Sequence, residues 1–223
     1  PGEDVEQYPR TLDEDLAKLA ALDPDVVFAP SVEAMYPAGY PIATQVAVEP
    51  LVNRYCGEFR AGHFTGAATV VTILFNLVQP ELAIFGEKDY QQLLIFRRMA
   101  ADLHMPVRIV SGATVREANG LAMSSRNRYL SQAQRDQAAT LRRVLLATGR
   151  ALLAGRRDFD VLESDGLRQL ADAGFEPQYL KIATPTLDSP SVDAADFVVL
   201  AAAVLGSARL IDNITLQDPA LRA

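Results

Sequence analysis

Cysteine and histidine are scarce in this sequence of 223 residues, which has one cysteine, Cys56, and two histidines. A single cysteine excludes an intrachain disulfide bond, and so few ligands exclude a zinc site built without carboxylates. Long apolar runs are absent as well, since none reaches the roughly 20 residues that a membrane-spanning helix needs, and no basic-then-apolar leader opens the sequence. We therefore expect a cytoplasmic protein without a membrane partner.

Positive charge is also in deficit, with 21 Lys and Arg against 28 Asp and Glu and a formal net charge of −7. This balance argues against a surface that collects nucleic acid, so we expect no nucleic-acid partner. The sequence has neither a Gly-X-Gly-X-X-Gly motif nor a Gly-Lys-Ser/Thr phosphate loop, which disfavours dinucleotide-dependent dehydrogenases and P-loop enzymes. What is present is 49% apolar residues, enough for a well-buried core.

Helix and strand patterns alternate through the first half of the chain. Thr11, with Glu14 three residues later, predicts a capping box at the start of an amphipathic helix. The patterns that follow predict a strand at Val26–Ala29, a β-rich stretch at Ala43–Val48, a buried helix at Gly66–Leu77, a strand at Leu82–Gly86, a helix from near Lys88 with a core stripe of Leu93, Phe96, Met99, Ala100 and Leu103, and a strand at Pro106–Val110. This alternation predicts an α/β fold with a doubly wound parallel sheet.

The second half has segregated helices and strands instead. Helices are predicted at residues 131–153 and 159–173, followed by strands at residues 179–183, 197–205 and 208–211. Such segregation predicts a smaller α+β domain. We expect one domain at residues 1–114 and the second at residues 115–223.

The segment Gly86-Glu87-Lys88-Asp89 joins the strand to the next helix and is the strongest indication of function. An open parallel sheet binds ligands beyond the carboxyl ends of its strands, where the next helix presents free N–H groups. Lys88 adds a positive charge for a phosphate, and Asp89 adds an acceptor for a hydroxyl or a metal ion. Gln92, one helical turn later, offers an amide to a substrate. The alternatives are an ordinary polar turn and a solvated helix residue.

Two further clusters carry polar chemistry. Ser124, Ser125 and Arg126 can follow a pyrophosphate as it leaves, because an Arg fork matches phosphate oxygens and hydroxyls donate flexibly; the alternative is a surface turn. Arg60 and His63 bracket Ala61-Gly62, and His63 is a candidate contact for an anionic substrate or a second subunit, with a structural role as the alternative. Cys56 is interpreted as a small buried apolar residue, since no base accompanies it.

Seven segments, in the same order along the chain, resemble the pantothenate synthetase (pantoate-beta-alanine ligase) family. They are Tyr8-Pro9-Arg10-Thr11, Phe28-Ala29-Pro30-Ser31, Met35-Tyr36-Pro37, Arg60-Ala61-Gly62-His63-Phe64, Gly86-Glu87-Lys88-Asp89-Tyr90-Gln91-Gln92, Leu121 to Asn127, and Arg209-Leu210-Ile211-Asp212-Asn213. The resemblance runs over nearly the whole sequence.

The resemblance implies a Rossmann-like nucleotidyltransferase domain with a parallel sheet, followed by a smaller α+β C-terminal domain that closes over ATP as a lid. It also implies ATP-dependent ligation of pantoate and β-alanine to pantothenate through a pantoyl adenylate, with release of AMP and pyrophosphate. Mg²⁺ would accompany the ATP, and the protein would be a homodimer.

The resemblance also assigns roles to residues. Gly86, Glu87, Lys88 and Asp89 would contact ATP, Val115 would lie at its adenine side, and Met123, Ser124, Ser125 and Arg126 would hold its phosphates. Lys88, Ser124, Ser125 and Arg126 would act in catalysis, and Asp89 would bind Mg²⁺. Gln92 would bind pantoate, with Arg60 and His63 as further candidates.

The sequence departs from the family in one respect. The family opens with a strand, a Pro-Thr-Met-Gly turn and a His-X-Gly-His motif, and these 223 residues contain none of them. We expect the family's N-terminal segment to be missing, and little activity from these residues alone. Two other functions stay open: another adenylate-forming enzyme of the nucleotidyltransferase superfamily that uses a different carboxylic acid, and a non-catalytic binding or dimerisation fragment.

Overall fold

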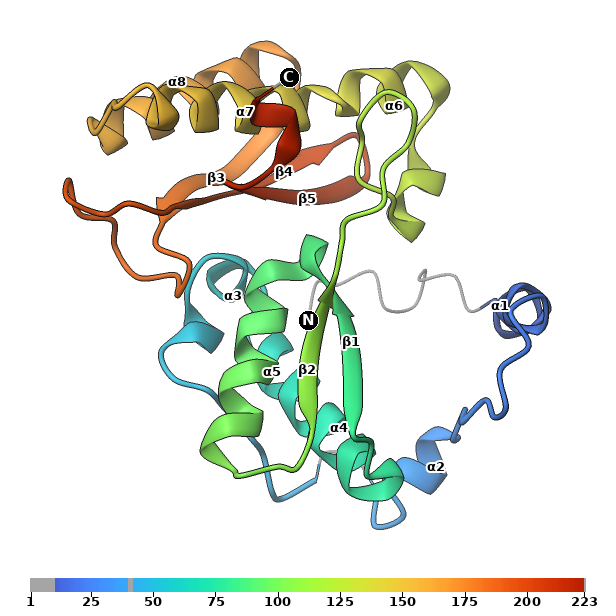
Figure 1. Cartoon of the computed structure of the whole chain (residues 1–223). Helices are drawn as coiled ribbons and strands as arrows, with labels where there is room; N and C mark the ends of the chain where they lie inside the picture. The colour runs from blue at the N-terminus through green and yellow to red at the C-terminus, as the bar shows by residue number, and fades with distance from the viewer. Residues whose placement is uncertain (1–10, 40–41, 223) are drawn as a thin grey trace. The chain divides into compact units, whose positions relative to one another are not determined.

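The structure of the protein, a computed structural model, describes residues 11–39 and 42–222. The chain divides into two compact units after Val46. The first unit contains α1 (Leu12–Ala20) and the short helix α2 (Val32–Met35) among its described residues. The second unit contains every strand that the structure describes, arranged in two sheets (Figure 1).

Two predictions for the first unit are wrong. The helix α1 forms, but Thr11 does not cap it with its side chain: its hydroxyl lies 3.3 Å from the Asp15 carboxylate and donates to it. The segment Val26–Ala29 is not a strand, and Val26 is 80% exposed. A strand needs a neighbour for its backbone groups, and no described residue pairs with this segment.

The β-rich stretch predicted at Ala43–Val48 is not a strand either, since these residues join no ladder that the structure describes. The chain continues through η1 (Leu51–Asn53) and α3 (Cys56–Phe59) into the long helix α4 (His63–Val78). This last helix confirms the prediction for residues 66–77. It begins three residues earlier because Gly62, with φ +76°, serves as its N-cap.

A parallel βαβ unit follows and confirms the α/β prediction. Strand β1 (Leu82–Gly86) leads through η2 (Glu87–Asp89) into α5 (Tyr90–Asp102), and β2 (Arg108–Gly112) then pairs with β1 in parallel register from Leu82↔Arg108 to Gly86↔Gly112. Figure 1 shows α4 and α5 beside these strands.

The core stripe of α5 is largely as predicted. Leu93, Phe96, Met99 and Ala100 are buried, and the ring of Phe96 lies 4.6 Å from that of Phe85 on β1, measured between centroids. The prediction for Leu103 is wrong, because α5 ends before this residue and its side chain is 50% exposed.

The second sheet is antiparallel with strand order β3-β4-β5 and confirms the α+β prediction. Its strands are β3 (Glu176–Ala183), β4 (Val198–Leu205) and β5 (Ala208–Thr215), and α6 (Gln132–Ala138), α7 (Thr140–Leu153) and α8 (Phe159–Asp172) precede them. Figure 1 shows α7 and α8 along one face of the sheet, and the buried side chains between the two layers form the main core.

Two boundaries in this part differ from the prediction. The helix predicted at residues 131–153 is divided at Ala139 into α6 and α7. Strand β5 continues four residues past Ile211 to Thr215, so Asp212 and Asn213 belong to the strand. The domain boundary at residues 114 and 115 stays a prediction.

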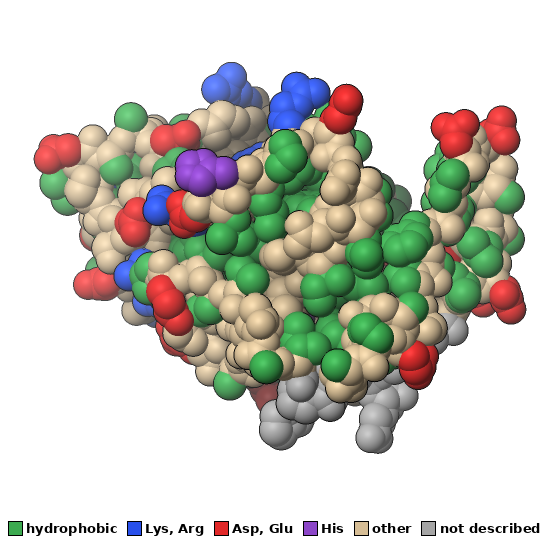
Figure 2. Space-filling model, turned by 90° about the horizontal axis from the view of Figure 1, so that it is seen from below, with side chains coloured by type: hydrophobic (Ala, Val, Ile, Leu, Met, Phe, Trp, Pro, Cys, Tyr) green, Lys and Arg blue, Asp and Glu red, His purple; other side chains and the backbone are tan. Residues whose placement is uncertain are grey.

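Apolar side chains gather in a broad patch on the face that Figure 2 shows. In the unit after Val46, the exposed large apolar side chains include Leu77, Val78, Leu82 and Ile84. The predicted burial of α4 therefore fails at its last turn. Among the described residues, β1 pairs with β2 alone, which leaves one edge of β1 unpaired. No described helix is both long enough and apolar enough to cross a membrane.

Two helical glycines allow a test of the packing around α3. A Cβ atom added to Gly57 on α3 would lie 2.1 Å from the carbonyl oxygen of Val52, whereas one added to Gly66 on α4 would meet nothing within 4 Å. We expect Gly57→Ala to lower the free energy of unfolding by about 1–3 kcal/mol, since a backbone oxygen cannot rotate away. Gly66→Ala should raise it by up to about 1 kcal/mol. Urea unfolding measures both, and equal shifts would contradict the close approach at Gly57.

Candidate functional site

The turn after β1 places the predicted phosphate-binding residues at the carboxyl end of the parallel sheet. Gly86 ends β1, and the single 3₁₀ turn of Glu87–Asp89 precedes α5. The side chain of Lys88 is 20% exposed, and its Nζ lies 3.9 Å from Oδ1 of Asp89, which is 48% exposed. The two charges therefore lie side by side at the position where an open α/β sheet binds ligands.

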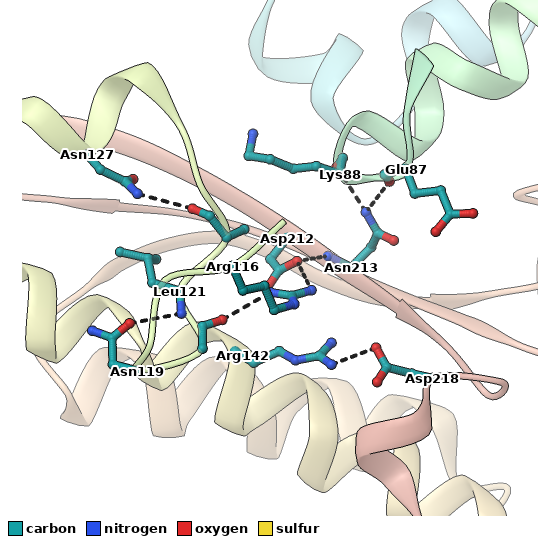
Figure 3. A network of polar contacts seen from close by, with 12 residues as sticks. Glu87, Lys88, Arg116, Asn119, Leu121, Asn127, Arg142, Asp212, Asn213 and Asp218 are labelled. Atoms are coloured by element: carbon teal, nitrogen blue, oxygen red, sulfur yellow. Dashed lines mark hydrogen bonds and ion pairs between the residues drawn. The ribbon is translucent and has the colours of Figure 1, made fainter. Parts of the chain in front are cut away.

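The carbonyl oxygens of this turn are held from the other sheet. Asn213 on β5 is buried, and its Nδ2 donates to the carbonyl oxygens of both Glu87 and Lys88 at 2.9 Å (Figure 3). Both oxygens are thus fixed by one amide group, while the side chains of Glu87 and Lys88 make neither bond.

The residue before Asn213 holds a second segment. Asp212 is 4% exposed and accepts two hydrogen bonds from Arg116, at 2.8 and 3.0 Å. Arg116 also donates to the carbonyl oxygen of Gly120, and residues 116 and 122 form an antiparallel bridge. Residues 116–120 therefore form a turn, and its arginine is bound to the antiparallel sheet.

The predicted adenine-side and phosphate residues lie on and after this hairpin. The N–H of Met123 donates to the carbonyl oxygen of Val115 at 2.9 Å, and both side chains are more than half exposed. Ser124 caps the 3₁₀ helix η3 (Ser125–Tyr129), where its Oγ accepts from the N–H of Arg126 at 3.2 Å. The exposed side chains of Val115 and Met123 therefore stand on a backbone that is held by hydrogen bonds.

A buried asparagine joins η3 to the hairpin. Asn127 is 3% exposed, and its Nδ2 donates to Oε1 of Glu117 at 2.7 Å and to the carbonyl oxygen of Ala122 at 3.1 Å. Ser131 then caps α6 in a capping box with Gln134.

Five of the predicted site residues line one pocket. It lies between α3, α4 and the start of α5 on one side and the antiparallel sheet on the other, and it is open to solvent. The predicted residues that line it are Arg60, His63, Lys88, Asp89 and Gln92. Nη1 of Arg60 lies 2.8 Å from Nε2 of His63, so the ring nitrogen must accept from the guanidinium.

The other predicted residues do not line this pocket. Val115, Met123, Ser124, Ser125 and Arg126 lie on the hairpin and η3, whereas Asp212 and Asn213 of β5 do line it. The two predicted clusters therefore flank one strand, and both are bonded to it through Asp212 and Asn213.

Sequence reasoning missed a polar group at the wall of the pocket, which Cys56 and Tyr179 both line. Cys56 is buried as predicted, but its Sγ lies 3.0 Å from the hydroxyl of Tyr179 and accepts from Nη2 of Arg209 at 3.4 Å. Burial, and next the neighbouring thiol, raise the pKa of Tyr179 above its ordinary range. The phenol therefore stays protonated and can donate to the sulfur. Tyr179 and Arg209 stand in the different strands β3 and β5, and no pattern in the sequence links either of them to Cys56.

The glutamine beside the predicted one is structural. Oε1 of Gln91 accepts from the N–H of Cys56 at 3.2 Å, and its Nε2 donates to the carbonyl oxygens of Leu51 and Arg54 at 2.7 Å. Both glutamines line the pocket, but the amide of Gln91 is used to fix α3.

Two tyrosines tie the loop between β3 and β4 to the other layer. The hydroxyl of Tyr55 donates to the carbonyl oxygen of Leu187 at 3.0 Å, and that of Tyr90 donates to the carbonyl oxygen of Pro185 at 2.9 Å. Burial raises the pKa of both hydroxyls. Leu187 is fully buried at this junction.

The described residues contain no group of three or more His, Cys, Asp or Glu that could hold a metal ion by itself. Asp89 offers one carboxylate. Mg²⁺ is usually bound by one or two carboxylates together with waters and substrate phosphates, so this donor fits a metal that arrives with a nucleotide.

Comparisons with known proteins agree on one family. The family model described as pantoate-beta-alanine ligase matches residues 1–215. The pantothenate synthetase of Pseudomonas entomophila is 51% identical over 217 residues, which cover 97% of this chain and 76% of that protein. The pantothenate synthetase of Saccharophagus degradans is 50% identical, with the same coverage of both chains.

Solved structures match as well. The crystal structure of pantothenate synthetase from Thermus thermophilus has a TM-score of 0.89 at 47% identity, covering 96% of this chain and 78% of that one. Pantoate-beta-alanine ligase from Francisella tularensis, complexed with beta-gamma ATP and β-alanine, has a TM-score of 0.76 at 28% identity, covering 96% and 73%.

The single thiol reports on the pocket. Because Cys56 is the one cysteine of the sequence and is 6% exposed, we expect a thiol reagent to label the folded protein far more slowly than the urea-unfolded protein. Tyr179→Phe removes the hydroxyl that covers the sulfur, so labelling of the folded variant should be faster. Absorbance of the released aromatic thiolate measures both rates. Equal rates in folded and unfolded protein would contradict the burial of Cys56.

Proposed function

Because the chain belongs to the pantoate-beta-alanine ligase family, we propose that it is the ligase that joins pantoate to β-alanine at the expense of ATP. The observation that carries the proposal is the pocket in which Lys88, Asp89 and Gln92 of the βαβ unit meet Arg60 and His63. Cationic, carboxylate and amide groups in one cavity suit a substrate that has both a carboxylate and hydroxyls.

In the first step, the pantoate carboxylate attacks the α-phosphorus of ATP, the bond to the β-phosphate breaks, and pyrophosphate leaves. A carboxylate needs no general base to act as a nucleophile, so positioning and electrostatics supply most of the acceleration. Lys88 would stabilise the charge that develops on the phosphates, and Ser124, Ser125 and Arg126 would follow the departing pyrophosphate. Gln92 would hold pantoate in line.

In the second step, the amine of β-alanine attacks the carbonyl carbon of pantoyl adenylate and AMP leaves. The amine must reach the site unprotonated, and it loses a second proton as the amide forms. A closed pocket protects the adenylate from water in the meantime. The pocket lies between the βαβ unit and the antiparallel sheet, and this position supports the proposed sequence of events.

The remaining contacts of ATP belong to the same proposal. Gly86, Glu87, Lys88 and Asp89 would contact ATP, Val115 would lie at its adenine side, and Met123 would help Ser124, Ser125 and Arg126 to hold its phosphates. Asp89 would also bind Mg²⁺, which neutralises phosphate charge when bound.

The wider setting of the enzyme completes the proposal. We propose a nucleotide-binding domain at residues 1–114, a lid domain at residues 115–223, a homodimer, and a cytoplasmic location, which the single cysteine supports.

Lys88 provides the first test. In the full-length protein we expect Lys88→Ala to lower pantoate-dependent exchange of pyrophosphate into ATP by about 10²–10³-fold, because a fixed charge at the phosphates is lost. Circular dichroism should show an unchanged fold. Lys18→Ala, at an exposed lysine of α1, is the matched control and should leave the rate unchanged. Unaltered exchange in Lys88→Ala would refute the phosphate role, and exchange that needs a carboxylic acid other than pantoate would refute the substrate.

Gln92 separates the two substrates. We expect Gln92→Ala to raise the KM for pantoate by about tenfold, the value of one or two lost hydrogen bonds, while the KM for ATP changes little. Steady-state kinetics with each substrate varied in turn measures both constants. Gln169→Ala, at an exposed glutamine of α8, serves as the control. Equal losses for pantoate and ATP would contradict the assignment.

A further inference from the structure

Two consecutive residues of β5 point to opposite faces of the antiparallel sheet. Successive side chains of a strand alternate between its faces. Leu210 and Ile214 belong to the core under the helices, so Asp212 between them faces the same way. Asn213 faces the other layer, where it reaches the turn at Glu87 and Lys88.

Asn213 is hydrogen-bonded directly to the backbone of Lys88. Nδ2 of Asn213 uses its two hydrogens on the two carbonyl oxygens of the turn, each at 2.9 Å, and the residue is 7% exposed. These bonds fix the backbone from which the Lys88 side chain enters the pocket.

Asp212 is connected indirectly, through Arg116 and Asn127, to the segment at residues 123–126. Asp212 holds Arg116 by two hydrogen bonds, and Arg116 belongs to the hairpin that carries Val115 and Met123. Asn127 then joins Glu117 of this hairpin to η3, which carries Ser125 and Arg126. Figure 3 shows Asp212 bonded to Arg116 and, next to it on the strand, Asn213 bonded to the turn at Glu87 and Lys88.

We propose that Asp212 and Asn213 are positioning residues that set the spacing between the Lys88 turn and the segment at residues 115–126. The inference rests on the proposed function, in which those two groups hold different parts of one ATP molecule. Neither residue need touch the nucleotide, because each acts through the backbone of the group that it holds. A displacement of about 1 Å at a reacting group can cost 10²-fold in rate.

A double-mutant cycle between Asn213 and Lys88 tests the proposal in the full-length protein. We expect Asn213→Ala to lower kcat/KM for ATP about 100-fold in pyrophosphate exchange. Weaker binding accounts for about tenfold of this loss, and calorimetry should show it as a dissociation constant for ATP that is about tenfold higher. In the Lys88→Ala background the same change should cost about twofold at most, since the side chain to be positioned is gone. Asn213→Ser, whose hydroxyl keeps one donor, is the milder variant should Asn213→Ala not fold, and it should show the same dependence on Lys88.

Tyr55→Phe is the matched control. It also removes one hydrogen bond between the two layers, that to the carbonyl oxygen of Leu187, but Tyr55 does not line the pocket. We expect it to leave kcat/KM for ATP within about twofold of wild type. A loss as large as that of Asn213→Ala would show that any link between the layers suffices, and would overturn the proposal.

The outcomes separate this inference from the proposed function. A wild-type protein that shows no pantoate-dependent exchange would refute the proposed function. In that case the double-mutant cycle is measured through the dissociation constants for ATP. If Asn213→Ala weakens ATP binding when Lys88 is present but not when Lys88 is replaced by alanine, the positioning role is still supported. Equal losses in both backgrounds, or no loss in either, would overturn it.

Discussion

The candidate site depends on a strand that places two polar side chains on its two faces. Asp212 and Asn213 are buried in β5, and each satisfies groups that would otherwise be costly to bury: a guanidinium on one face and two carbonyl oxygens on the other. The parallel βαβ unit alone would present Lys88 on a turn with no partner from the rest of the protein. The antiparallel sheet makes that turn part of a fixed frame.

The sequence predicted most of this frame from local patterns. Period and turn signals were sufficient for α4, α5, β1 and β2, because these elements follow one another closely in the chain and bury apolar faces. They failed at Val26–Ala29, where an apolar run has no described partner strand. They also ended β5 at Ile211, because polar residues such as Asp212 and Asn213 usually mark the end of a strand.

The site itself could be predicted only in part. Lys88 follows directly after a strand and Gln92 lies one helical turn later, and this spacing alone indicates a ligand site. The segment at residues 123–126 was predicted from the resemblance to a family. The resemblance includes Arg209 but assigns it no role, and Tyr179 lies outside its segments. Their contacts with Cys56 could not be predicted, since they form only when three distant segments come together. Contacts of that kind are a property of the tertiary structure and leave no local trace in the sequence.

Asn213 binds Glu87 and Lys88 through their carbonyl oxygens, groups that every amino acid has. These hydrogen bonds therefore do not depend on which side chains stand at positions 87 and 88. Evolution, or an engineer, can exchange those side chains to suit another acid or nucleotide without rebuilding the scaffold. In this fold, the location of the candidate site and its proposed chemistry depend on different residues.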